Sequence, residues 1–247
     1  MSKTIDAKGV YYAQLNEQVR ELIRKGEKDI NIVNVNGQRY IGGGVEAQDV
    51  KIRIQGVTGE DLGAFMEGPT IEVMNNAQDG VGNTMNDGTI IIRGLAGDVV
   101  GYGMRGGKIF IRDDVGYRVG IHMKGFKDKQ PVLVVGGCAG DFFGEYQAGG
   151  CLILLGLTKS RKKSVVGDYC GTGMHGGVMY IRGDFNENFL GKEVNHFELT
   201  QEDTDRLKPI LDEFACTFGI TEDILDYDRY RKIIPVSTRP YGSLYAY

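Results

Sequence analysis

Histidine, cysteine, proline and tryptophan are all scarce in this chain of 247 residues. It contains three histidines, four cysteines, five prolines and no tryptophan. The four cysteines form no C-x-x-C pair, which argues against zinc-knuckle and iron–sulfur signatures and favours reduced thiols in the cytoplasm. Long apolar runs are also missing. We therefore expect neither a membrane span nor, at the first residues, a signal peptide.

Basic charge is not in excess either. The chain has 29 lysines and arginines against 33 acidic residues, a formal net charge of −4, which argues against a general nucleic-acid binder. Glycine, in contrast, is abundant: 38 residues, roughly twice the usual share. The hydrophobic fraction of 41% is typical of a folded chain, and glycine does not recur at every third position as in collagen. The glycines must therefore lie where folded backbone needs positive φ or close approach.

Pairs of apolar residues, with one residue between their members, recur along the chain. The first members of successive pairs are separated by 19 residues four times, and then by 23, 20 and 27 residues. Such two-residue alternation predicts short strands with one face buried, and a fixed interval predicts stacked repeats. The pairs are Val33/Val35, Ile52/Ile54, Ile71/Val73, Ile90/Ile92, Ile109/Ile111, Val132/Val134, Leu152/Leu154 and Met179/Ile181.

Two further ladders share this period. Two residues after each pair stands a residue that tolerates left-handed backbone, which predicts a corner at Gly37, Gly56, Asn75, Gly94, Asp113, Gly136, Gly156 and Gly183. A second glycine ladder runs through Gly44, Gly63, Gly82, Gly101, Gly120 and Gly144. Three residues after most of these glycines stands a methionine, as at Met66 and Met85, which we interpret as interior packing.

Three ladders per period predict an all-β chain, a parallel β-helix built as a single-stranded solenoid with coils of about 19 residues. The left-handed β-helix is built from six-residue repeats, and a period of about 19 residues is not a multiple of six. The period therefore favours a right-handed β-helix. We expect a segment 1–28 with a capping helix over 10–25, the β-helix over 29–190, and a helical and extended tail over 191–247. Within that tail, Thr200 is predicted to begin a helix, 221–227 a second short helix, and the residues after Pro235 to pack on the rest.

The middle residue of each apolar pair should point outward. The first three are the polar residues Asn34, Arg53 and Glu72, whereas the later ones are apolar. An outward apolar stripe needs a cover, and two alternatives stay open: the C-terminal helices fold back over it, or a partner protein binds it. The second alternative makes a candidate partner interface of Ile91, Phe110, Leu133, Ile153 and Tyr180.

We assign no catalytic, cofactor-binding or metal-binding residue from the sequence. The histidines His122, His175 and His196 lie far apart, the G-x-G strings lack the GK[ST] ending of a phosphate loop, and no G-x-S-x-G or H-E-x-x-H motif occurs. Aspartates recur at one phase of the coil, which fits either carboxylates for sugar chemistry or turn-forming residues, and we favour turns. They are Asp61, Asp79, Asp98 and Asp141.

Several strings of this sequence resemble a known family. GGGVEAQDVKIRIQG, the run from NNAQDGVGNTMNDG to GIHMKG, GEYQAGGCLILLG and GTGMHGGVMYIRG are similar to the GXGXG β-helix domain of glutamate synthase large subunits, with resemblance over about residues 5–240. The same strings are similar to a subunit of formylmethanofuran dehydrogenase, but the helical tail ending in RKIIPV favours glutamate synthase.

The resemblance implies a stand-alone form of a domain that carries no catalytic residue in that family. The amidotransferase nucleophile, the FMN and the iron–sulfur cluster are then expected on partner subunits, and this chain is expected to bind no cofactor. We expect a cytoplasmic structural subunit, inactive on its own, that organises an amidotransferase and a flavin-containing synthase in an oxidoreductase complex making glutamate from glutamine and 2-oxoglutarate. A homo-oligomer stays open, as do a formylmethanofuran dehydrogenase-like subunit and a β-helix carbohydrate enzyme.

Overall fold

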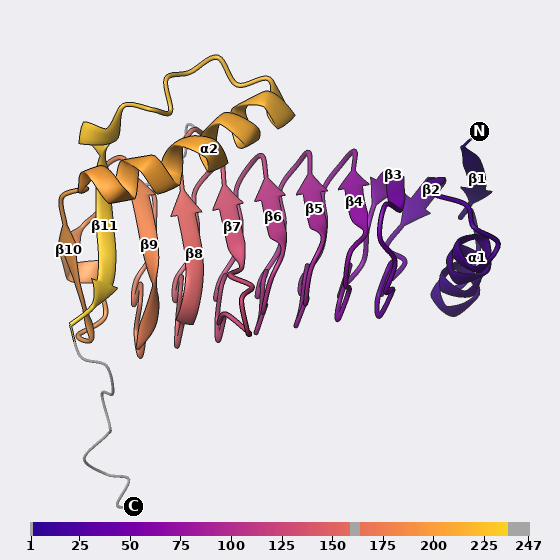
Figure 1. Cartoon of the computed structure of the whole chain (residues 1–247), viewed down its shortest axis with the longest axis horizontal. Coiled ribbons are helices and arrows are strands. Elements are labelled where there is room, and N and C mark those ends of the chain that lie inside the picture. The colour runs from indigo at the N-terminus through magenta and orange to yellow at the C-terminus, as the bar shows by residue number, and fades with distance from the viewer. Residues whose placement is uncertain (1, 159–163, 237–247) are drawn as a thin grey trace, which may run out of the picture.

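The computed structural model of the chain describes residues 2–158 and 164–236. Eight strands stack in chain order along the long axis of the molecule, each parallel to the next, so the predicted parallel β-solenoid is confirmed (Figure 1). These strands are β2 (Asp29–Asn36), β3 (Lys51–Val57), β4 (Thr70–Val73), β5 (Thr89–Ile92), β6 (Lys108–Ile111), β7 (Val132–Val135), β8 (Ala148–Leu154) and β9 (Gly176–Arg182).

The interior of the solenoid is a stack of identical positions. Ile71 pairs with Ile90, and Ile90 with Ile109, so that branched aliphatic side chains lie directly above one another from coil to coil. All three are fully buried, and the same holds for Met66 and Met85 on the next ladder. The interpretation of the methionines as core residues is therefore confirmed. A row of buried, β-branched side chains at one register fixes the pairing of every coil with the next.

The predicted register is wrong at β7. Leu133 pairs with Ile109 and Val135 with Ile111, so the interior pair is Leu133 and Val135 rather than Val132 and Val134. Leu133 is fully buried inside the solenoid and does not face outward; Val134 takes that place beside Phe110. The reason is that all four residues of this strand are apolar, so alternation does not define its register, and the preceding coil is five residues longer than its neighbours, with 24 rather than 19 residues between paired positions.

The predicted register is also wrong in the first coil. Ile30 and Ile32 pair with Ile52 and Ile54, in place of Val33 and Val35. The register shifts between Ile32 and Val35, and Asn34 adopts a left-handed φ of 59°. Such a bulge moves the two-residue alternation by one position, so that apolar residues on both sides of it fit a strand pattern.

A helix closes the N-terminal end of the solenoid, as predicted. Helix α1 (Tyr12–Arg24) places Leu15 and Val19 against the core of the first coil. The short strand β1 (Lys3–Asp6) pairs in parallel with β2. The sequence did not reveal β1 because only Ile5 of its four residues is buried, which is too short a pattern to show alternation.

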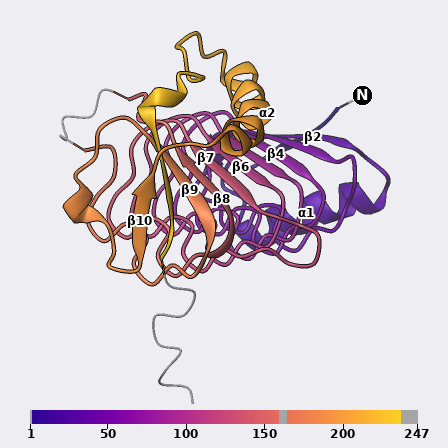
Figure 2. The ribbon, with the colours of Figure 1, turned by 60° about the vertical axis from the view of Figure 1, so that its left-hand side comes forward.

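The C-terminal segment folds back over the sheet and then extends it. Helix α2 (Gln201–Phe218) begins at the predicted cap Thr200, whose side chain and that of Asp203 form a capping box, and it crosses the later strands (Figures 1 and 2). Strand β11 (Tyr230–Pro235) then pairs antiparallel with β9 and with β10 (Val194–Phe197). These two strands end the parallel stack. Within the described residues, no helix is both long and apolar enough to cross a bilayer.

The second helix predicted over 221–227 does not form. This stretch holds no α-helix; at its end is the 3-10 turn η2 (Tyr227–Arg229), and another 3-10 turn, η1 (Glu187–Phe189), lies before β10. Seven residues are few for a helix, and here tertiary contacts hold the backbone: the buried Arg182 donates hydrogen bonds to the Glu222 carboxylate and to the Asp223 carbonyl. The prediction that the chain packs after Pro235 falls mainly on 237–247, which lie outside the described residues.

Candidate functional site

The outward apolar stripe lies beneath α2. Phe110, Ile153 and Tyr180 are almost completely buried and form one cluster with Leu207 and Phe214 of the helix, the rings of Phe110 and Phe214 meeting edge to face at 5.4 Å. The alternative in which a C-terminal helix folds back is therefore the one the structure shows. Phe110, Ile153 and Tyr180 offer no free surface to a partner, so the predicted interface is corrected at these positions as well as at Leu133. Ile91 is half-buried.

The polar part of the stripe begins where α2 ends. Arg93 donates a hydrogen bond of 3.1 Å to the Thr217 carbonyl in the last turn of the helix, where a cation is favourable, and its guanidinium lies over Phe218. Glu72 then accepts bonds from Arg93 and Arg53 at 2.7 and 3.1 Å. Burial raises the pKa of Glu72, but the two arginines outweigh burial and the net pKa lies below its ordinary value. The outward residues of the stripe are thus apolar where α2 covers them and polar beyond its C-terminal end.

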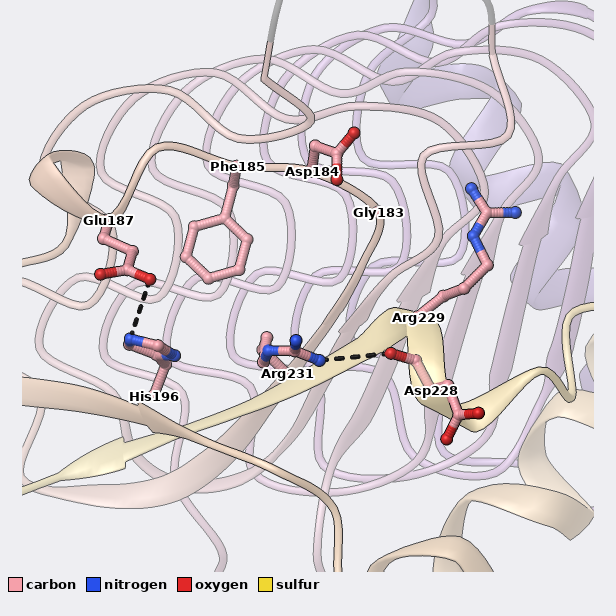
Figure 3. Close-up of a pocket in the computed structure, with 8 residues that line it drawn as sticks. All are labelled: Gly183, Asp184, Phe185, Glu187, His196, Asp228, Arg229 and Arg231. Carbon is pink, nitrogen blue, oxygen red and sulfur yellow. Dashed lines mark hydrogen bonds and ion pairs between the residues drawn. The ribbon is translucent and has the colours of Figure 1, made fainter.

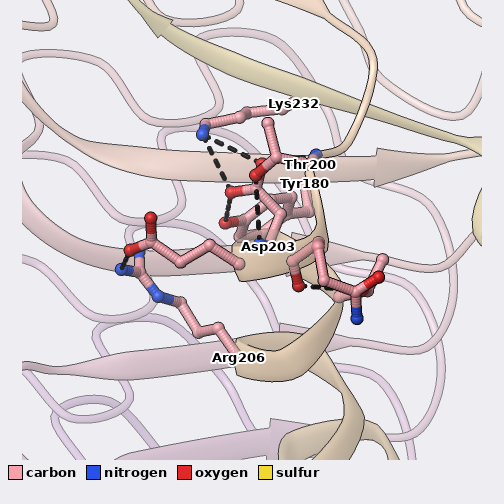
Figure 4. Close-up of polar contacts among 8 residues, drawn as sticks. Tyr180, Thr200, Asp203, Arg206 and Lys232 are labelled. Carbon is pink, nitrogen blue, oxygen red and sulfur yellow. Dashed lines mark hydrogen bonds and ion pairs between the residues drawn. The ribbon is translucent and has the colours of Figure 1, made fainter.

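A buried acid fastens the start of α2 to the sheet (Figure 4). Asp203 is 3% exposed; its carboxylate accepts a 2.6 Å bond from the Tyr180 hydroxyl and bonds of 2.8 and 3.0 Å from the Lys232 ammonium. The backbone and hydroxyl of Thr200 donate to it as well. Burial raises the pKa of Asp203, but the bonds from Lys232 and Tyr180 outweigh it and hold the net pKa well below the ordinary range. This network joins α2 to β9 and β11, so its role is structural.

A polar pocket of about 350 Å³ opens at the C-terminal end of the solenoid (Figure 3). Within it, His196 Nε2 lies 3.2 Å from Glu187, and Arg231 donates to the Asp228 carbonyl. Its charged lining is mixed, with three acidic side chains and two arginines beside His196. It is lined by Gly183, Asp184, Phe185, Glu187, His196, Asp228, Arg229 and Arg231.

The structure does not bring the three histidines together. His122 stacks on Tyr146 at 5.3 Å, His175 contacts the Gly173 carbonyl through Nδ1, and His196 pairs with Glu187. Across residues 2–158 and 164–236, no group of three or more histidine, cysteine, aspartate and glutamate side chains is placed to hold a metal ion.

The glycine strings have a common backbone geometry. In each connecting corner, three alternate residues adopt left-handed φ: in one coil these are Gly80, Gly82 and Thr84, at 72°, 68° and 53°. This alternation explains why the sequence repeats G-x-G-x-G. Only the middle position is always glycine, because a Cβ at Gly82 would lie 2.3 Å from Ile109 Cδ1 of the next coil. The Gly82 amide donates to the preceding coil, so it belongs to the solenoid ladder rather than to a phosphate loop.

The first coil again differs by two residues from the prediction. Gly42, rather than Gly44, occupies the middle position, since its Cβ would lie 2.5 Å from Ile71 Cδ1. Gly44 is the last of the three left-handed residues in this corner, and a Cβ there would have no neighbouring atom within 4 Å. The offset follows from the bulge at Asn34, which also shifted the apolar pair of this coil.

The predicted strand-end corners divide into two kinds. Gly37, Gly56, Gly156 and Gly183 have positive φ, as predicted. The prediction of left-handed backbone is wrong at the other four, Asn75, Gly94, Asp113 and Gly136. Among these, glycine is needed for close approach instead: a Cβ at Gly94 would lie 2.0 Å from Asn76 Oδ1, and one at Gly136 would lie 2.1 Å from the Arg112 carbonyl. Asn75 accepts a bond from the following amide, as turn-forming residues do.

The recurring aspartates bond across coils. Asp79 accepts from the Asp98 amide, Asp98 from the Tyr117 amide and Asp141 from the Asp168 amide, at 2.8 to 3.0 Å. Asp61 accepts from the side chain of Asn83. These aspartates therefore lie at corners, but each carboxylate bonds to the backbone or side chain of the next coil rather than to its own turn as predicted.

The thiols differ sharply in access, which gives a direct test of the packing. Burial raises the pKa of Cys151 and Cys170 to about 12, whereas Cys216 on α2 is exposed. Because the thiolate is the reactive form, iodoacetamide at pH 8 should modify Cys216 in the native protein and leave Cys151 and Cys170 intact. Peptide mass spectrometry after timed quenching measures this. Modification of Cys151 as fast as Cys216 would contradict the packing beneath α2.

Comparison with known proteins gives two matches. A family model described as "GXGXG motif" matches residues 12–236. A relative from Methanocaldococcus jannaschii, described as "Uncharacterized protein MJ1350", is 49% identical over 248 residues, covering 98% of this chain and 95% of the relative.

Proposed function

This chain belongs to the GXGXG-motif family, the glutamate synthase-type β-helices, and on that premise we propose that it is a non-catalytic structural subunit of a glutamate synthase complex. In this role it organises an amidotransferase subunit and a flavin-containing synthase subunit, which together make glutamate from glutamine and 2-oxoglutarate. The chain supplies a rigid solenoid against which the two catalytic subunits are held, and we place the complex in the cytoplasm.

The observation that carries the proposal is the extent of the family match. It runs from the first residue of α1 to the residue after β11, so it includes the solenoid together with the elements that close both of its ends. A capped solenoid whose coils pair strand by strand is a stiff rod, because each coil is fixed by the side chains of its neighbours. Such a rod suits the task of holding two other proteins at a set separation.

The chemistry of the reaction is proposed to lie on the partner subunits. Glutamine hydrolysis by an amidotransferase uses a cysteine thiolate, and burial raises the pKa of two of the four cysteines, Cys151 and Cys170, far above neutrality. We likewise assign the FMN and the iron–sulfur cluster to the synthase partner. The recurring aspartates already have structural partners, since Asp79 and Asp98 each accept a hydrogen bond from the backbone of the next coil.

Purification from the source organism tests this proposal. The tagged chain, isolated at low salt under anaerobic conditions, should carry an amidotransferase and a flavin-containing subunit in fixed ratio, identified by mass spectrometry and flavin absorbance. Recovery with subunits of a molybdenum or tungsten enzyme would instead support a formylmethanofuran dehydrogenase-like role. Recovery of the chain alone would contradict the proposed function.

A further inference from the structure

A groove crosses the outer face of the later strands, beside the first half of α2. Its floor is a row of side chains at one register: Val132 on β7 pairs with Cys151 on β8, which pairs with Val178 on β9. Ile234 continues the row on β11, because the antiparallel pairing with β9 brings it beside Val178. These four residues line a cavity of about 790 Å³. The sheet therefore keeps an apolar hollow next to the face that α2 covers.

The chemistry of the groove favours an apolar, uncharged occupant. Cys151 and Val178 on its floor are each 6% exposed, and Ile210 on the α2 wall is half-buried. Two cations stand at the rim, and each already has an acidic partner: Arg206 lies 3.5 Å from Glu202, and Lys232 bonds to the buried Asp203 (Figure 4). An apolar hollow of this size, with paired charges around it, is typical of a surface that another polypeptide segment covers.

One end of the groove is closed, and the chain leaves the described residues at the other end. On β6, Lys108 takes the register position of Val132 and pairs with Glu213 of α2 at 2.5 Å, which closes that end. Strand β11 forms the other end and finishes at Pro235, one residue after Ile234 of the groove floor (Figure 1). Residues 237–247 therefore begin beside the groove.

Residues 237–247, which lie outside the described residues, have the composition that the groove favours. Their sequence, STRPYGSLYAY, contains no acid and a single charged side chain, Arg239. Pro240 and Gly242 are turn-forming residues, so the chain can reverse there toward the groove. Tyrosine can bury its ring against apolar side chains while its hydroxyl stays in water, and it can pack beside a guanidinium such as that of Arg206. The large apolar side chains of the segment are Tyr241, Leu244, Tyr245 and Tyr247.

Length and tethering favour this segment over a separate protein. The floor spans three strand steps from β11 to β7, about 14 Å, whereas a segment of this length can extend over about 36 Å. Because the segment is joined to the chain beside the groove, its effective concentration there is on the order of millimolar. We propose that residues 237–247 fold back into the groove and cover its apolar floor with their leucine and tyrosine side chains. This docking does not depend on the proposed function.

Chymotrypsin cleavage of the full chain tests the docking. A docked segment must leave the groove before the protease can bind it, so cleavage after Tyr241 and Tyr245 should be at least tenfold slower than in a synthetic peptide of residues 237–247. Intact mass spectrometry at timed intervals measures both rates. Ile210→Lys places a charge in the groove wall and should raise the cleavage rate at least fivefold. Gln201→Lys adds the same charge at an exposed position of α2 and should leave the rate unchanged.

Photo-cross-linking of the full chain identifies the occupant of the groove. With p-benzoylphenylalanine in place of Tyr245, and with isotopically heavy and light chains mixed in equal amounts, cross-links should join this position to groove peptides of the same chain. Those peptides contain Val132, Cys151, Val178 or Ile210.

Three outcomes would overturn the inference. Cross-links between heavy and light chains would assign the groove to the segment of a second copy. Cross-links only to other surfaces, with cleavage of the isolated chain as fast as that of the free peptide, would show that the segment does not dock. Fast cleavage of the isolated chain that becomes slow in the complex purified from the source would show that a partner subunit, rather than the groove, protects the segment.

Discussion

Replacing Asp203 with alanine should lower the free energy of unfolding by about 3–5 kcal/mol, because it leaves a buried cation and a buried hydroxyl without their partner. The Lys232 ammonium and the Tyr180 hydroxyl both bond to this carboxylate. The loss includes the Thr200 capping box at the start of α2. Urea denaturation followed by circular dichroism at pH 7 measures it.

Asp205 provides the matched control for this substitution. It lies in the first turns of the same helix, is exposed, and accepts a single bond from the side chain of Gln201. Asp205→Ala should therefore change the free energy of unfolding by about 0.5 kcal/mol or less. Equal losses for the two variants would show that helix charge, rather than the buried network, accounts for the effect.

The stabilisation from Asp203 should also depend on pH, in a stated direction. Although burial raises the pKa of this carboxyl, the bonds from Lys232, Tyr180 and Thr200 lower it more, so the folded-state pKa lies below the unfolded value of about 3.9. A lowered pKa stabilises the fold above the unfolded value and loses that contribution as the pH falls through the folded one. The stability difference between the wild type and Asp203→Asn should shrink between pH 5 and pH 2. A constant difference would contradict it.

Replacing Gly82 with alanine should lower the free energy of unfolding by about 2–5 kcal/mol. Left-handed backbone at φ +68° costs a residue with a Cβ about 1–2 kcal/mol, and overpacking adds about 1–3 kcal/mol. The overpacking arises because the new Cβ would lie 2.3 Å from Ile109 Cδ1, in a core where each coil rests on the next. Thermal or urea unfolding of the purified variant measures the loss.

Two further variants divide that loss into its parts. Gly103→Ala has the same left-handed backbone, at φ +56°, but the nearest atom lies 3.6 Å away, so it should cost only about 1–2 kcal/mol. Ile109→Val removes the atom that clashes and should restore part of the stability of Gly82→Ala in a double-mutant cycle. Additive losses in that cycle would contradict the close contact between the glycine ladder and the core.

The sequence revealed the solenoid because its coils repeat. Stacked coils place equivalent residues at equal intervals, so Ile71, Ile90 and Ile109 appear in the chain at the spacing at which they pair in space. The local signal at Thr200 was equally direct, since a capping box depends only on residues three apart. Where a structural unit is built from neighbours in sequence, its pattern can be read there.

The sequence-based predictions failed where the local pattern is ambiguous or where the contacts join residues far apart in the chain. At β7, four consecutive apolar residues conceal which of Leu133 and Val134 faces the core. Strand β11 pairs with β9 although about fifty residues separate them, and no local pattern marks that pairing. Alternation showed that Phe110 points outward, but not that α2 covers it.

The buried network of Asp203 was invisible for the same reason. Its partners Tyr180 and Lys232 are 23 and 29 residues away in the chain, and each alone resembles an ordinary strand residue.

The most direct measurement is the rate of glutamate formation from glutamine and 2-oxoglutarate by the purified amidotransferase and synthase subunits, with and without this chain. A structural subunit that holds the two partners together should raise the coupled rate at least tenfold at equimolar addition, while the chain alone forms no glutamate. The same rate in the presence and absence of the chain, with no assembly between the partners, would contradict the proposed function.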